Sequence, residues 1–194
     1  MKKLSIFALA LSAGLLFSAC GNLVSNYDAN SDGIDKIFKD VTKTVGEDSK
    51  IDEIKIMFSD DPGQESMISY FMVDFQSKSD QKELLRVEYH GHSGWTQVEP
   101  LEITVRGNPE DFDLNNEVNP FSQFRPDIIK KVYDSAIQKV GEECDNIKFV
   151  SISADPYIDE DIEYSTYLEG TLKSNNVTKK IFLYYDKEGN LIDK

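Results

Sequence analysis

The stretch IDKIFKDVTKTVGE, residues 34–47, returns 95 positions later as IKKVYDSAIQKVGE, residues 129–142. Both stretches place apolar residues three and four apart, which is the spacing of one face of an amphipathic α-helix. Each reaches a glycine, the residue most often found just past a helix end. The sequence therefore predicts one helix at the start of each of two repeats. The corresponding apolar positions are Ile34, Ile37, Phe38, Val41 and Val45, and Ile129, Val132, Tyr133, Ala136 and Val140.

The correspondence continues through IKIMFSDDP at 54–62 and IKFVSISADP at 147–156, which both read as a strand closed by an Asp-Pro turn. The segments that follow in each half are rich in β-branched and aromatic residues, as strands are. We therefore expect an α+β fold of two tandem repeats. Each repeat is predicted to be one helix packed on an antiparallel meander of three to four strands.

Differences between the halves define the expected boundaries. In WTQVEPLEITVRG, Leu101, Ile103 and Val105 alternate with polar residues, which predicts a fourth strand in the first half. The aromatic residues Phe112, Phe121 and Phe124 indicate that the connection packs across both repeats. The predicted organisation is a signal peptide at 1–19, a tether at 20–32, a first repeat at 33–106, a connection at 107–125 and a second repeat at 126–194.

The N-terminus has the pattern of an export signal, with Lys2 and Lys3 before an apolar run that is too short to span a bilayer. The run ends in LFSAC, residues 16–20, and here the chain resembles bacterial lipoprotein precursors. That resemblance implies a diacylglycerol on Cys20, which would anchor the protein in the bacterial cell envelope, on the periplasmic or cell-surface side. The alternative is an ordinary secretory signal with an incidental cysteine.

The cysteine count limits disulfide formation, and the net charge limits the chemistry of the partners. If Cys20 carries lipid, Cys144 is the only other cysteine and no intramolecular disulfide forms. Removing the signal leaves 19 basic residues (21 minus 2) against 35 acidic ones, a net charge of −16. Such a surface repels nucleic acid and attracts basic partners or divalent cations. Acidity that serves only solubility is the equally simple alternative.

A helix on a curled antiparallel meander, given twice, is similar to the tandem PepSY-like and cystatin-like α+β modules of bacterial envelope proteins. In sequence the resemblance rests on IFLYYDKEGNLI, residues 181–192, which is similar to the closing hairpin of PepSY-like repeats. It implies a non-catalytic module that binds or inhibits a protein or peptide partner.

DANSDGIDKIFKD, residues 28–40, has the start of a calcium loop, with Asp28, Asn30, Asp32 and Gly33 at ligand and turn positions. The position that needs a bidentate carboxylate holds Lys39, however. We therefore interpret the stretch as the entry to a helix, with Asp32 as its N-cap. No metal ligand is predicted here.

The two histidines lie in HGHSGW, residues 90–95, which lacks the second glycine of a hydrolase nucleophile elbow and reads as a turn. Because no other catalytic or cofactor motif is present, we predict that the protein is not an enzyme and uses no cofactor. The leading hypothesis is a lipid-anchored module that binds an envelope protein or peptide, with membrane contact through Cys20 and no nucleic acid. The alternatives are a carrier or sensor of a small apolar ligand and a calcium-responsive protein.

Overall fold

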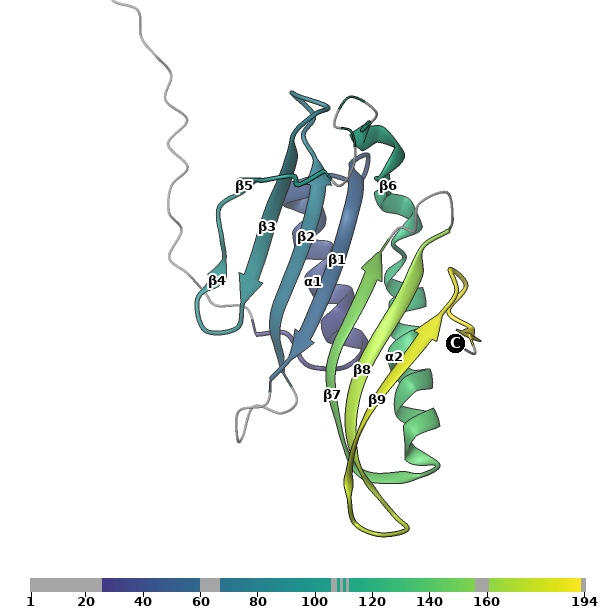
Figure 1. Ribbon diagram of the computed structural model, residues 1–194. Coiled ribbons are helices and arrows are strands. Elements are labelled where there is room, and N and C mark those ends of the chain that lie inside the picture. Colours follow the sequence, from purple (N-terminus) through teal and green to yellow (C-terminus); the bar gives the residue numbers. More distant parts are fainter. Residues whose placement is uncertain are drawn as a thin grey trace, which may run out of the picture.

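The computed structural model describes residues 26–59, 67–105, 108, 110, 112–155 and 161–192. Figure 1 shows one large sheet with two α-helices side by side on one of its faces, and no helix of the described chain covers the other face. Short 3₁₀ helices η2 (Leu114–Asn116) and η3 (Phe121–Gln123) lie in the connection. The remaining elements in chain order are α1 (Ser31–Val45), β1 (Lys50–Phe58), β2 (Ile68–Gln76), β3 (Leu84–His90), β4 (Gly94–Trp95), β5 (Glu99–Leu101), β6 (Asn119–Pro120), α2 (Pro126–Gly141), β7 (Cys144–Asp155), β8 (Glu163–Leu172), β9 (Thr178–Tyr185) and β10 (Leu191–Ile192).

The predicted fold class of two tandem helix-plus-meander repeats is wrong. Within the described residues the strands form a single sheet of ten strands in the order β10-β9-β8-β7-β1-β2-β3-β4, with β5 paired to β3 and β6 to β1. The physical reason is that β1 and β7, which would each be an unpaired edge in a separate repeat, pair antiparallel with each other over residues 54–57 and 151–154. Pairing satisfies the backbone groups of both strands and removes two edges.

The core is shared by both halves as well. One continuous buried cluster contains the apolar faces of α1 and α2 and the inward side chains of the sheet. At the junction, the Phe149 ring lies 5.0 Å from Phe58 and 4.6 Å from Tyr133. The Tyr133 hydroxyl also donates a hydrogen bond to the carbonyl oxygen of Ala29, 2.5 Å away, across the two helices. The helices therefore pack as one layer.

The helical stripes are confirmed, because all ten stripe positions except the half-buried Tyr133 are buried. The cap of α1 differs from the prediction. Asn30, not Asp32, is the N-cap, and its side chain accepts a hydrogen bond of 3.0 Å from the Gly33 amide. Gly33 has to be glycine because a Cβ there would lie 1.9 Å from the carbonyl oxygen of Asp28. The DANSDG stretch is thus used to start a helix against a tightly apposed backbone.

The region between the halves is only partly as expected. Phe121 and Phe124 are buried in the shared core, as the aromatic content of the connection predicted. The fourth strand is shorter than predicted, because only Glu99–Leu101 pairs with β3 and residues 102–105 form no strand. Leu101 and Ile103 instead pack on a small second cluster around Leu114.

Candidate functional site

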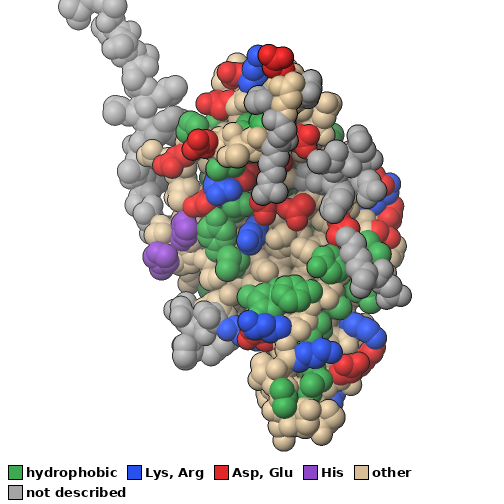
Figure 2. All heavy atoms as spheres, viewed as in Figure 1, with side chains coloured by type: hydrophobic (Ala, Val, Ile, Leu, Met, Phe, Trp, Pro, Cys, Tyr) green, Lys and Arg blue, Asp and Glu red, His purple; other side chains and the backbone are tan. Residues whose placement is uncertain are grey.

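The helix-free face of the sheet is the candidate site, and β1 shows how the sequence builds it. Ile54, Ile56 and Phe58 point into the core, so the alternate residues Lys55 and Met57 point to the opposite face. Figure 2 shows this face. Hydrophobic side chains lie in several groups across its middle, and acidic side chains gather above them.

Strand register aligns the outward side chains into rows that cross the whole sheet. The first, which we call the aromatic row, runs Phe182, Tyr167, Ser151, Met57, Tyr70 and His90, each residue opposite the next. Neighbouring strands lie about 4.8 Å apart, so the five steps span about 24 Å. The row therefore has the length of a bound peptide segment and crosses the β1–β7 junction.

The aromatic row is exposed at its β9 end and near its centre. Phe182 is 60% exposed and Met57 is 37% exposed. The Phe182 ring is stacked on Tyr167, with centroids 4.8 Å apart and an angle of 10°. The ammonium of Lys180 lies 5.8 Å from the Tyr167 ring centre. A large apolar ring held out in water by stacking on a neighbour favours contact with a partner.

A second row runs parallel to the first through Tyr184, Ser165, Ser153, Lys55, Met72 and Glu88. With Ser151 of the aromatic row, Ser153 and Ser165 place short hydroxyl side chains at the centre of the face. Long side chains, Tyr167 on one flank and Lys55 on the other, border this serine patch. The short residues therefore present hydroxyl donors and acceptors between longer side chains.

The acidic row is the third, and it contains Glu163, Asp155, Glu53, Asp74 and Arg86. The pKa of Glu53 is raised to about 7, mainly by burial and next by the negative charge of Asp155. The pKa of the adjacent Asp52 is raised to about 6, mainly by burial and next by the negative charge of Asp74. Burial also raises the pKa of Asp155. These carboxyl groups lack enough cations around them, so a positive charge from a partner would stabilise them.

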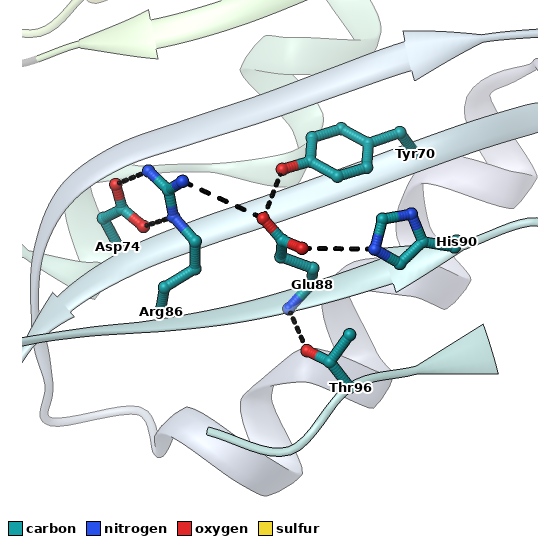
Figure 3. A network of polar contacts seen from close by, with 6 residues as sticks. All are labelled: Tyr70, Asp74, Arg86, Glu88, His90 and Thr96. Carbon is teal, nitrogen blue, oxygen red and sulfur yellow. Dashed lines mark hydrogen bonds and ion pairs between the residues drawn. The ribbon is translucent and has the colours of Figure 1, made fainter. Parts of the chain in front are cut away.

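Figure 3 shows how polar contacts fix the β2–β3 side of the face. The guanidinium of Arg86 donates two hydrogen bonds to Asp74, of 2.7 and 2.6 Å, and Asp74 is only 2% exposed. The Tyr70 hydroxyl donates to Glu88 at 2.7 Å, and His90 Nε2 lies 3.1 Å from the other Glu88 oxygen. The Tyr70 hydroxyl keeps the pKa of Glu88 below its usual range. The ring of Tyr70 is therefore held in place at the end of the aromatic row.

A pocket of about 290 Å³ lies beside this network, between β3 and the β4–β5 segment. Its lining includes Arg86, Glu88, Thr96 and Leu101. Thr96 Oγ1 accepts a hydrogen bond of 3.0 Å from the Glu88 amide, so this backbone group at the edge of β3 has a partner. The pocket is open and mixed in polarity, and it extends the face beyond the end of the aromatic row.

The residues singled out from the sequence lie in several places. His90 ends β3, and its ring lies 5.9 Å from that of His92 in the predicted turn. Cys144 is free and buried at the start of β7. Cys20, the predicted lipid attachment site, lies outside the described residues. Within the described parts of the chain, no group of three or more His, Cys, Asp or Glu side chains is placed to hold a metal ion.

The rows themselves were missed by sequence reasoning. The segment YFMV at 70–73 did carry one signal, because it predicts a strand that is apolar on both faces. The alignment of Tyr70 with Met57 and Tyr167 depends on register across the β1–β7 junction, which a single strand does not encode.

Comparisons with protein families, with curated proteins and with solved structures found no match for this chain. Over the described residues, neither helix is long and apolar enough to cross a membrane. The lipoprotein and PepSY-like resemblances therefore stay predictions, and function has to be inferred from the site.

Proposed function

We propose that the protein is a lipid-anchored protein of the bacterial cell envelope that binds a protein or peptide partner without catalysis. The helix-free face of the sheet is the binding surface, and Cys20 carries the lipid. The observation that supports this most is the aromatic row, with Phe182 and Met57 exposed on a face that no described helix covers.

Charge indicates the chemistry of the partner. The acidic row places Glu53 and Asp155, whose pKa values are raised, on the same face as the aromatic row, with the second row between them. The chain as a whole carries a formal charge of −14. A segment with apolar side chains over the aromatic row and Lys or Arg over the acidic row complements both features. The hydroxyl groups of Ser151, Ser153 and Ser165 supply hydrogen bonds between them.

Site-specific photocrosslinking in living cells tests this function. Benzoylphenylalanine replaces Phe182 on the face, or Lys39 on α1 as the matched control. Lys39 is exposed and belongs to the helix layer on the opposite side of the sheet, so it reports chance encounters. We expect one discrete crosslinked partner from position 182 and none from position 39.

Two further variants test whether the crosslink depends on the aromatic row and whether Cys20 anchors the protein. Met57→Ser, on the other half of the chain, should weaken crosslinking at position 182 about fivefold or more, because it removes apolar contact from the same row. Cys20→Ser should abolish labelling by a fatty-acid analogue and release the protein from membranes. Equal crosslinking at positions 182 and 39 would refute binding on the face, and persistent labelling of Cys20→Ser would refute the anchor.

A further inference from the structure

The two edges of the sheet differ. On one side β3 is covered, with Leu84–Arg86 paired to β5 and Tyr89–His90 paired to β4. Between these two pairings, the backbone amide of Thr96 donates a hydrogen bond of 2.8 Å to the carbonyl oxygen of Glu88. The backbone of this edge is therefore occupied along its length.

The opposite edge is open. β9 has eight residues, and β10 pairs with only two of them, Tyr184 and Tyr185. Six residues (8 minus 2), at 178–183, have no strand on their outer side in the described chain. Alternate amides and carbonyls of this segment point away from β8 and lack a backbone partner there. An open edge of this length can accept another strand.

A groove lies directly against the open edge. Its volume is about 140 Å³, and it lies between the end of α2 and the helix side of β9. Val140, Cys144, Ile181 and Leu183 supply the apolar part of its lining. On the other side of β9, Phe182 stands exposed beside Tyr167. A strand added to β9 would place alternate side chains over the groove and next to Phe182.

The charge of β9 indicates which side chains the added strand would carry. Residues 178–185 read TKKIFLYY, with two lysines and no acid in a chain where acidic residues outnumber basic ones by 35 to 21. Lys179 has only a distant ion pair, 3.7 Å from Glu143, and Lys180 lies over Tyr167. Consecutive strand residues point to opposite faces, so Lys179 borders the groove and Lys180 lies on the Phe182 side. Carboxylates of an incoming strand on that side would pair with the ammonium group of Lys180.

We propose that the edge of β9 at residues 178–183 binds an extended segment of the partner by strand addition. The segment alternates apolar residues, which enter the groove beside Ile181 and Leu183, with acidic residues on the opposite face near Lys180. This inference rests on the proposed binding function and specifies how the backbone of the partner is held.

The test uses the full chain and a labelled synthetic heptapeptide, acetyl-Glu-Val-Glu-Val-Thr-Val-Thr-amide, in fluorescence anisotropy. Two derivatives carry N-methyl groups, one on the valines and the other on the third, fifth and seventh residues. Consecutive amides of a strand point to opposite edges, so only one derivative should lose the bonds to β9. We expect that derivative to bind at least about tenfold more weakly and the other to bind like the parent peptide.

Hydrogen exchange then locates the peptide. The outward-pointing amides among residues 179–183 should gain protection when the parent peptide binds, because free edge amides exchange with water. Lys180→Glu should weaken binding, whereas the matched control Lys82→Glu, in the β2–β3 turn, should not.

The contrary outcomes are distinct. Equal binding of both N-methyl derivatives, or no protection of 179–183 at about 1 mM peptide, overturns strand addition. Binding on the face would still be tested by the effect of Met57→Ser on the crosslink, because Met57 lies on β1, three strands from β9. A peptide-free dimer that Lys180→Glu converts to a monomer would assign the edge to a second copy of the chain and overturn the peptide assignment.

Discussion

Replacing Glu53 by Gln should make the protein more stable at high pH and change the pH dependence of its unfolding. Glu53 has a pKa raised from 4.5 to about 7 by burial and by the charges of Asp155 and Asp74. Between these two pKa values the folded state binds more protons than the unfolded state. The free energy of unfolding of the wild type therefore falls as pH rises from about 4.5 to about 7.

The magnitude follows from the size of that change. A pKa difference of this size corresponds to about 3 kcal/mol at a pH above both values. The side chain is partly open to water, so we reduce the figure to about 1–2 kcal/mol. Glu53→Gln removes the ionisation, and we expect the variant to gain about 1–2 kcal/mol over the wild type near pH 8. Near pH 4, where the wild-type carboxyl is mostly protonated in both states, the two proteins should be about equally stable.

Urea denaturation followed by tryptophan fluorescence measures this directly. Trp95 is the only tryptophan of the chain, and its indole donates a hydrogen bond of 3.1 Å to the buried Tyr27 hydroxyl, so it reports loss of the core. Glu47→Gln, at an exposed loop outside the acidic row, is the control for charge alone. A Glu53→Gln curve parallel to the wild-type curve from about pH 4 to about pH 8 would refute the view that this carboxyl is destabilised in the fold.

Two further predictions concern packing and a buried charge. Gly170→Ala should lower the free energy of unfolding by about 1–3 kcal/mol, because the added Cβ would lie 2.8 Å from the Cβ of Cys144. The control is Gly141→Ala, whose Cβ would meet nothing closer than 3.6 Å. Thermal denaturation should show this control to be neutral or slightly stabilising. Arg86→Met should cost about 3–5 kcal/mol because it leaves the buried Asp74 carboxylate unpaired. The double variant with Asp74→Asn should recover much of that loss in urea unfolding, and equal losses in single and double variants would contradict the assignment.

The features that the sequence predicted are those set by local spacing. The apolar stripes of α1 and α2 are periodic over several turns, and their residues are buried as predicted, apart from the half-buried Tyr133. The sheet required information that no local pattern carries. The alternation in residues 54–58 and 147–154 indicates two strands but does not say that they pair with each other. The predicted fourth strand likewise pairs only over Glu99–Leu101, which includes Pro100. Beyond it Ile103 packs on the second cluster, so the alternating apolar pattern alone was misleading.

The β1–β7 pairing that overturned the two-repeat fold also produces the candidate site. Phe182 and Tyr167 come from the second half, and Met57 and Tyr70 come from the first. These side chains form one row only because Met57 lies opposite Ser151 across the junction. The proposed binding surface is therefore a property of the joined sheet. A partner that contacts both ends of the row would add its binding energy to the stability of the junction, so binding should also raise the resistance of the β1–β7 ladder to unfolding.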